Sequence, residues 1–298
     1  MKKIPVGATI AHAYRFAFGD ILTVLRSIWL PLAVQLGLTI FLLRHFIPLL
    51  RAFEAKDPAA ISLMGPLLLL YPIILILFFA QMTTVMKVAL GIKQEIPLID
   101  FPFGKDMWRL LGAFIVAGLA IVAMLIAFAL AAGVLSFLLS ATGMSKPLLA
   151  ILVGLLFVIG YGGMIFVIFR FLFLLAPVNI AEQRLGIGRA WQLSQGNFWR
   201  SFLIVLAILL PMIVAEYAVM FAAIGWPPMP HGEGPQAFEA RRLEWNIATL
   251  QAMVTYWYIA LPFFALLMLV YIGTICGAQA FAYRKLTEDK ISTPVAAD

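Results

Sequence analysis

Long uninterrupted runs of apolar residues dominate the hydrophobic pattern of this chain. Between Asp57 and Lys87 there are 29 consecutive uncharged residues, and between Arg109 and Lys146 there are 36. About 20 mostly apolar residues in a helix span the hydrocarbon core of a bilayer. The runs do not alternate with the two-residue period of a membrane β-strand. The pattern therefore predicts an all-α integral membrane protein.

Six spans are expected from these runs. They are 27–50, 64–90, 109–140, 147–176, 199–225 and 250–283. The run that leads into the sixth span is long for one helix, so its early part, 245–258, is an alternative interfacial segment. We expect the whole chain, 1–298, to form a single membrane domain.

The basic residues are divided unequally between the two sides that six spans create. Six spans place both termini on one side, and that side carries 15 lysines and arginines while the other carries six. Cytoplasmic segments of membrane proteins are enriched in these residues. The bias predicts that the N- and C-termini are cytoplasmic.

Two segments on the predicted cytoplasmic side have polar residues at helical spacing. In 8–26, His12 and Arg15 belong to a polar stripe that lies opposite Tyr14, and a similar stripe recurs in 186–198. Such stripes predict amphipathic helices that lie in the surface of the membrane.

Three short polar sequences recur at similar intervals along the chain. Asp20, Asp106 and Asn197 each precede a predicted span, and their intervals are 86 and 91 residues. Each interval contains two spans, which predicts three two-helix repeats, with chance similarity of short sequences as the alternative. An Asp or Asn side chain can also accept from free N–H groups at a helix start, so these residues are candidate caps. The expected repeats cover 8–90, 98–180 and 186–285.

The composition supports a membrane protein. The chain is 64% apolar and 12% charged, with a mean hydropathy of +1.03, which excludes a soluble globular domain, a disordered chain and a disulfide scaffold. In this setting the net charge of +7 indicates contact with anionic lipid rather than nucleic acid. Cys276 is the single cysteine, and the histidines His12, His45 and His231 lie in separate segments, so we expect neither a metal nor a cofactor.

The segment 175–200 resembles a known family. It reads LAPVNIAEQRLGIGRAWQLSQGNFWR, in which a span ends near Pro177 and is followed by Glu182, Gly186 and a Leu-Ser-x-Gly-Asn stretch. This arrangement resembles the YciC-like bacterial inner-membrane proteins. It is also similar to the membrane domain attached to some glycerophosphodiester phosphodiesterases, but the chain lacks their soluble catalytic domain, so no phosphodiesterase activity is carried over. The resemblance implies a multi-pass fold in the bacterial inner (plasma) membrane.

Three charged residues form a candidate intramembrane polar or ligand site: Arg170, Glu182 and Glu216. Glu216 lies 15 residues after Ser201, or about 22 Å along a helix. An acid at this depth indicates proton relay, cation binding or a basic partner, and a hydrated place near the outer interface is the alternative. Arg170 either holds a lipid phosphate or anionic substrate, or extends to the inner headgroups or a neighbouring span.

Uncharged polar residues and small residues in the spans also have two interpretations each. Gln35 and Gln81 either line a pathway or hydrogen-bond between helices. The Gly273 and Gly277 pair, a GxxxG motif, marks either an oligomer face or close packing within the chain. Pro211, like other prolines in the spans, can free a backbone carbonyl, as in the broken helices of transporters.

No P-loop, nucleophile elbow or zinc-protease motif is present in the sequence. The main hypothesis is therefore a non-catalytic accessory or scaffold protein of the bacterial envelope. A transporter or channel for a small solute or lipid is the second hypothesis, and a membrane-embedded lipid enzyme is the third. The expected partners are membrane lipids, anionic on the cytoplasmic face, together with a second copy of the chain or another membrane protein.

Overall fold

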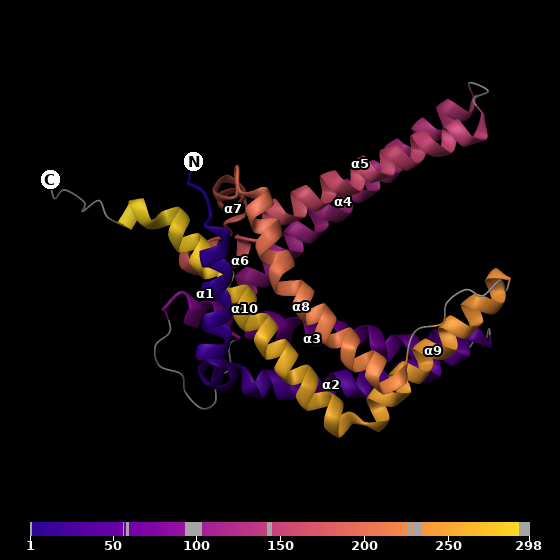
Figure 1. Ribbon diagram of the computed structural model, residues 1–298, viewed down its shortest axis with the longest axis horizontal. Helices are drawn as coiled ribbons and strands as arrows, with labels where there is room; N and C mark the ends of the chain where they lie inside the picture. The colour runs from indigo at the N-terminus through magenta and orange to yellow at the C-terminus, as the bar shows by residue number, and fades with distance from the viewer. Residues whose placement is uncertain are drawn as a thin grey trace. The chain divides into compact units, whose positions relative to one another are not determined.

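The computed structural model describes residues 2–55, 57, 60–92, 103–141, 145–225, 228 and 234–291. Within these ranges every regular element is a helix, which confirms the predicted all-α class (Figure 1). In chain order the helices are α1 (Val6–Gly19), α2 (Ile21–Glu54), α3 (Ala60–Ala89), α4 (Lys105–Ala141), α5 (Lys146–Leu172), α6 (Leu175–Ala181), α7 (Ile187–Leu193), α8 (Phe198–Ile224), α9 (Pro235–Thr255) and α10 (Trp257–Ile291).

In the described part of the chain, six helical segments are long and apolar enough to cross a membrane, in agreement with the six spans predicted. They are Ile21–Ala52, Leu67–Ala89, Lys105–Leu139, Ala150–Ala181, Phe198–Ala222 and Trp257–Glu288. The protein is therefore treated below as a polytopic membrane protein.

The structure corrects one predicted helix boundary. The helix expected over 8–26 ends at Gly19, and residues 21–26 belong to the first candidate span instead. The run expected to hold the sixth span is divided at Tyr256: residues 250–255 belong to α9, and the candidate span starts at Trp257, near the end of the segment 245–258 that the sequence offered as an alternative. No charged residue follows Glu244 in α9, and none occurs at the start of α10. The uncharged run therefore continues across the break between the two helices.

The chain divides into two compact units, and each is described by itself. The first unit comprises Met1–Thr9, Gly104–Ile204 and Gln279–Asp298, and the second comprises Ile10–Phe103 and Val205–Ala278. The single domain and the three two-helix repeats stay predictions.

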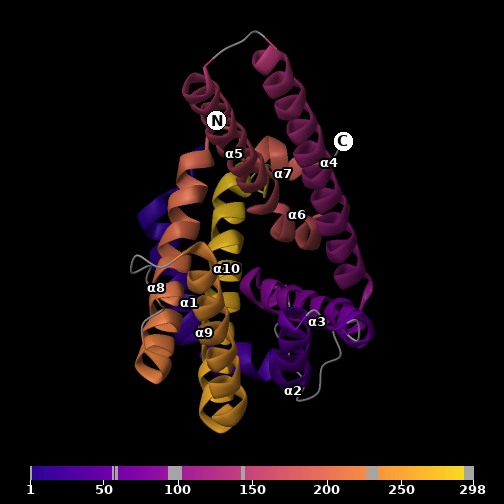
Figure 2. The same cartoon turned by 90° about the vertical axis from the view of Figure 1, so that its right-hand side faces the viewer.

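In the first unit, α4 packs against α5 along an antiparallel hairpin that both ribbon views show (Figures 1 and 2). A Cβ atom on Gly160 of α5 would lie 2.0 Å from the ring of Phe128 on α4, so only glycine allows this approach. The short helices α6 and α7 contact each other and α5, and α6 also contacts α4. Much of this hairpin is covered by exposed apolar side chains, such as Leu130 and Val158.

In the second unit, α2 packs against α3 and also contacts α9. The Gln81 amide donates to the Gln35 side-chain oxygen at 2.5 Å, and both side chains are buried. These glutamines therefore hydrogen-bond between helices, as one of the two interpretations of the sequence predicted.

The GxxxG motif of α10 lies against α1. Added Cβ atoms would lie 3.2 Å from Ala17 at Gly273 and 3.0 Å from the Phe16 ring at Gly277. Small residues allow such close backbone contact between membrane helices. The motif is therefore used for packing inside the chain.

A hydrogen bond from α1 compensates for the proline in α8. Pro211 has no N–H group, so it cannot donate to the carbonyl of Ala207, four residues earlier. The Tyr14 hydroxyl donates to that carbonyl at 2.9 Å. The Tyr14 hydroxyl is protonated at neutral pH, as tyrosine ordinarily is, and burial raises its pKa further. A tyrosine from another helix thus occupies the place of the missing backbone donor.

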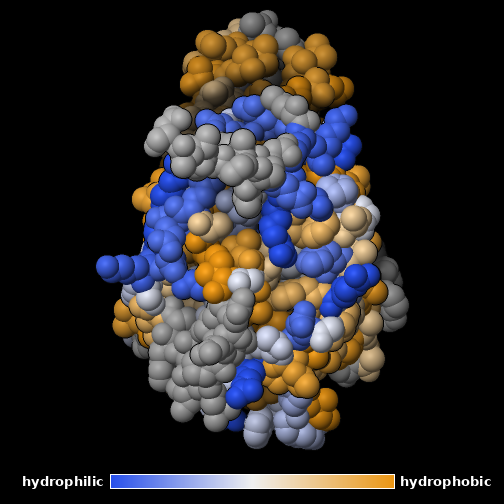
Figure 3. All heavy atoms as spheres, turned by 90° about the vertical axis from the view of Figure 1, so that its left-hand side faces the viewer, coloured by the Kyte–Doolittle hydropathy of each residue, from blue (hydrophilic) through white to orange (hydrophobic). Residues whose placement is uncertain are grey.

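The surface agrees with a lipid environment. In Figure 3, hydrophobic side chains (orange) occupy large parts of the face drawn. Leu69 is 73% exposed and Ile151 is 66% exposed. Contiguous apolar surface is rare on soluble monomers, and the hydrocarbon of a bilayer solvates it.

We expect the replacement Tyr14→Phe to lower the unfolding free energy by about 1–2 kcal/mol, because it leaves the Ala207 carbonyl without a donor in an apolar setting. In a Pro211→Ala background, residue 211 can donate to that carbonyl, so the same replacement should cost less than about 0.5 kcal/mol. Denaturant titration of the four proteins in mixed micelles measures both costs. Equal costs in the two backgrounds would contradict this account of the hydrogen bond.

Candidate functional sites

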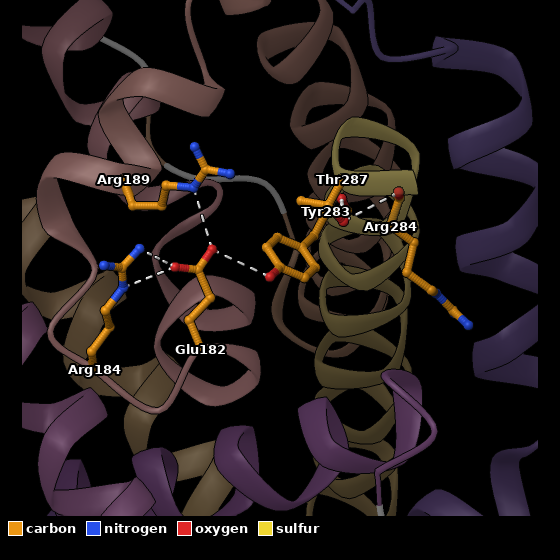
Figure 4. Close-up of polar contacts among 6 residues, drawn as sticks. All are labelled: Glu182, Arg184, Arg189, Tyr283, Arg284 and Thr287. Atoms are coloured by element: carbon orange, nitrogen blue, oxygen red, sulfur yellow. Dashed lines mark hydrogen bonds and ion pairs between the residues drawn. The ribbon is translucent and has the colours of Figure 1, made fainter. Parts of the chain in front are cut away.

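The first candidate site is a set of polar side chains around Glu182, called the Glu182 cluster: Glu182, Arg184, Arg189 and Tyr283. Arg184 donates to Glu182 Oε2 through Nε at 2.9 Å and also through Nη2. Arg189 Nε lies 3.3 Å from Oε1, and the Tyr283 hydroxyl donates to the same oxygen at 3.4 Å. Figure 4 shows these side chains converging on one carboxylate from the α6–α7 loop, α7 and α10. Both oxygens of Glu182 are therefore engaged by groups of this chain.

The loop that carries Glu182 is fixed by its backbone. Glu182 caps the C-terminus of α6, and its N–H donates to the Val178 carbonyl at 2.9 Å. Gln183 follows with a φ of 51°, a left-handed conformation that reverses the chain direction. A Cβ atom at Gly186 would lie 2.2 Å from the Val178 side chain, so glycine lets the returning chain pass close to α6.

Helix α4 holds the same loop from a second direction. The Arg109 guanidinium donates to the Gln183 carbonyl and pairs with Asp106 one turn earlier on its own helix. Three successive residues of the loop, 182–184, therefore take part in contacts with charged side chains. This arrangement stabilises a helix junction.

Arg170 is held against the face of an indole ring. Its guanidinium carbon lies 3.7 Å from the centre of the Trp191 ring and 5.4 Å from that of Phe166. A guanidinium over an aromatic face gains cation–π energy, about 0.5–2 kcal/mol depending on desolvation. Arg170 Nη2 also lies 3.4 Å from the Trp191 carbonyl, and its Nε is buried without a hydrogen-bond partner. This residue is thus partnered across α5 and α7.

The three repeat anchors have different surroundings. Asn197 is buried in front of α8, where its side-chain oxygen accepts from the Ile4 N–H at 2.9 Å and its amide donates to the Lys2 carbonyl at 3.1 Å. Asp106 lies in the first turn of α4 and pairs with Arg109. Asp20 is exposed at the junction of α1 and α2. Their equivalence and their role as caps stay predictions.

The second candidate site is a cavity of about 480 Å³ in the second unit, called the Glu216 cavity. It is lined by side chains of α8, α9 and α10 and by the turn between the last two helices. Half of the described lining residues are aromatic or sulfur-containing, among them Met220, Met253, Phe263 and Phe264. Of the lining residues that the structure describes, only Glu216 is charged.

Glu216 has no ionic or hydrogen-bonding partner among the residues that the structure describes. It lies six residues before the end of the span Phe198–Ala222, or about 9 Å along the helix. Glu216 is exposed rather than buried in protein, and it lines the cavity. In this respect Glu216 differs from Glu182, whose oxygens are both occupied.

The structure places the predicted site residues in separate units. Arg170 and Glu182 both belong to the first unit and both contact residues of α7, namely Trp191 and Arg189. Glu216 belongs to the second unit. Across the described part of the chain, no three His, Cys, Asp or Glu residues come close enough to hold a metal ion, and His231 lies outside the described residues.

Sequence reasoning missed two members of these sites. Tyr283 is 101 residues away from Glu182, so no local pattern connects them. The position of Trp191 indicates only the boundary of the membrane, although the pairing of an aromatic residue with an arginine near a span end is a usable signal.

The comparisons with protein-family models, with curated proteins and with solved structures found no match to this chain.

We expect Glu182→Gln to lower the unfolding free energy by about 1–3 kcal/mol, because Arg184 and Arg189 lose their shared carboxylate in a partly buried setting. The matched control is Glu288→Gln, which removes the exposed pair that Glu288 forms with Lys285 at 2.7 Å and should cost less than about 1 kcal/mol. Thermal unfolding in detergent compares the two variants with the unmodified chain. Equal melting temperatures for all three proteins would contradict a stabilising role for the cluster.

Proposed function

We propose that this chain is a non-catalytic accessory or scaffold protein of the bacterial inner membrane, akin to the YciC-like proteins that it resembles. The observation that carries this proposal is the Glu182 cluster. Its carboxylate is committed to two arginines and a tyrosine of the same chain, and Arg109 fixes the adjacent carbonyl. A carboxylate whose two oxygens are both occupied by groups of the same chain is typical of a structural junction between helix ends. A group that works on a substrate usually keeps a free face toward it.

Anionic lipid on the cytoplasmic face is the proposed partner. Several arginines of the first unit lie at the end of α5, in the α6–α7 loop, in the first turn of α7 and at the start of α8: Arg170, Arg184, Arg189 and Arg200. Each guanidinium carries five N–H donors, more than the contacts within the chain use, and Arg184 is 61% exposed. Planar guanidinium groups bind phosphate oxygens well. The proposed orientation, with both termini in the cytoplasm, places these residues beside the anionic leaflet.

We expect single-cysteine labelling to reveal this orientation. In a Cys276→Ala background, Glu239→Cys should react with a membrane-impermeant maleimide added to intact spheroplasts, whereas Glu288→Cys should react only after lysis. The motivation is the bias of 15 basic residues to six. The reverse labelling pattern would overturn the proposed topology.

We expect Arg184→Gln to weaken the retention of phosphatidylglycerol about fivefold, since a basic group near an anionic surface contributes about 1 kcal/mol. Arg184→Lys keeps the charge and should retain most of the lipid. Arg242→Gln removes an arginine of similar exposure, 56%, on the side predicted to face outward, and should change nothing. Native mass spectrometry of the purified proteins counts the bound lipids. Equal losses in the Arg184→Gln and Arg242→Gln proteins would contradict a specific cytoplasmic lipid surface.

A transporter of small solutes or lipids is the second candidate function. The Glu216 cavity favours it, because an unpartnered carboxylate in a span faces an apolar space large enough for a small molecule. Lipid and metabolite profiling of a deletion strain tests the transporter against the accessory role. Accumulation of one small solute or lipid would favour the transporter. If the purified protein converts that compound, the non-catalytic proposal is wrong.

A further inference from the structure

We infer that the Glu216 cavity binds a hydrophobic organic monocation, such as a quaternary ammonium or phosphonium ion or an amine with large apolar substituents. This inference does not rest on the accessory role proposed above. It rests on the charge, the lining and the position of the cavity in the second unit.

The charge of the cavity selects a cation. Among the residues that the structure describes, Glu216 is the one charged residue in the lining, and no basic side chain pairs with it. A carboxylate that faces apolar surroundings without a partner is unfavourable in free energy. A bound cation would supply the missing opposite charge, whereas an anionic ligand would add repulsion.

The lining selects an organic cation over a metal ion. Apart from Glu216, Tyr256 is the only one of the described lining residues with a side-chain oxygen. A hard metal ion prefers six or more oxygen ligands, which this cavity does not supply. The aromatic rings of Tyr256, Phe263 and Phe264 instead suit a cation whose charge is shielded by apolar groups, because ring faces attract such ions.

The volume and position suit a molecule that partitions into the membrane. A cavity of about 480 Å³ lies within the usual range for small-molecule sites. Met220 and Met253 add flexible, polarisable side chains that can adapt to varied shapes. Glu216 lies about 9 Å inside the end of its span, a depth that a hydrophobic cation reaches more readily than a hydrated one.

The test is equilibrium dialysis of tetraphenylphosphonium against the full chain in phosphatidylcholine nanodiscs, with empty nanodiscs measuring partition into lipid. We expect saturable binding of about one ion per chain. Glu216→Gln should weaken binding at least about tenfold, while Glu239→Gln, which removes an acid of α9 that pairs with Arg242 outside the cavity, should leave it unchanged. Tetraphenylborate, which has the same shape and the opposite charge, should not compete.

A second variant keeps the carboxylate and removes the space. Ala260 lines the cavity, and Ala260→Phe fills part of it, so this variant should also bind at least about tenfold more weakly. If gel filtration shows that the Glu216→Gln protein does not fold, the Ala260→Phe variant still tests whether the cation binds in the cavity. The inference is overturned if the unmodified chain shows no saturable binding, or if the folded variants bind as the unmodified chain does. Neither result changes the lipid retention or labelling expected of the accessory role.

Discussion

The absence of water inside a bilayer is the constraint on which this structure depends. A polar group in the hydrocarbon must find its partner within the protein. Tyr14 supplies the donor that Pro211 withholds from the Ala207 carbonyl, and Gln81 pairs with Gln35 across two helices. The first pairing joins α1 to α8, which are distant in the sequence, and the second joins the consecutive helices α2 and α3. The polar residues of the spans therefore specify which helices meet, while the apolar residues mainly keep them in the membrane.

The same constraint separates the two acids of greatest interest. Glu182 lies at a helix junction, where three side chains surround it and the adjacent carbonyl is held by Arg109. Glu216 lies within a span and faces an apolar cavity without a partner from the described residues. The first acid is explained by the fold alone. The second is left with an unmatched charge, and this difference directs the search for a ligand to the second unit.

The class of the fold could be predicted because long apolar runs have few structural solutions. The number of spans followed from hydrophobic length alone, and the six candidate spans of the structure agree with it. The excess length of the sixth run predicted a separate segment over 245–258 as an alternative, but the turn itself at Tyr256 could not be located, since the chain around it contains neither a charge nor a glycine to mark it. The break at Asp20 was also missed, because the same periodic pattern continues from α1 into α2. Periodicity reports which face is polar but not where a helix ends.

The sites were predictable only in part, for a physical reason. Glu182, Arg170 and Glu216 stand out because charges are rare in or beside apolar runs, but the identity of their partners depends on contacts between distant segments. Tyr283 and Trp191 carry no charge, so the sequence around each does not identify its partner, which lies 101 residues away for Tyr283 and on another helix for Trp191. Sequence thus identifies the groups that cost free energy when they leave water. Only the packed structure shows whether that cost is met by the chain itself, as at Glu182, or is left for a bound ligand, as we infer at Glu216.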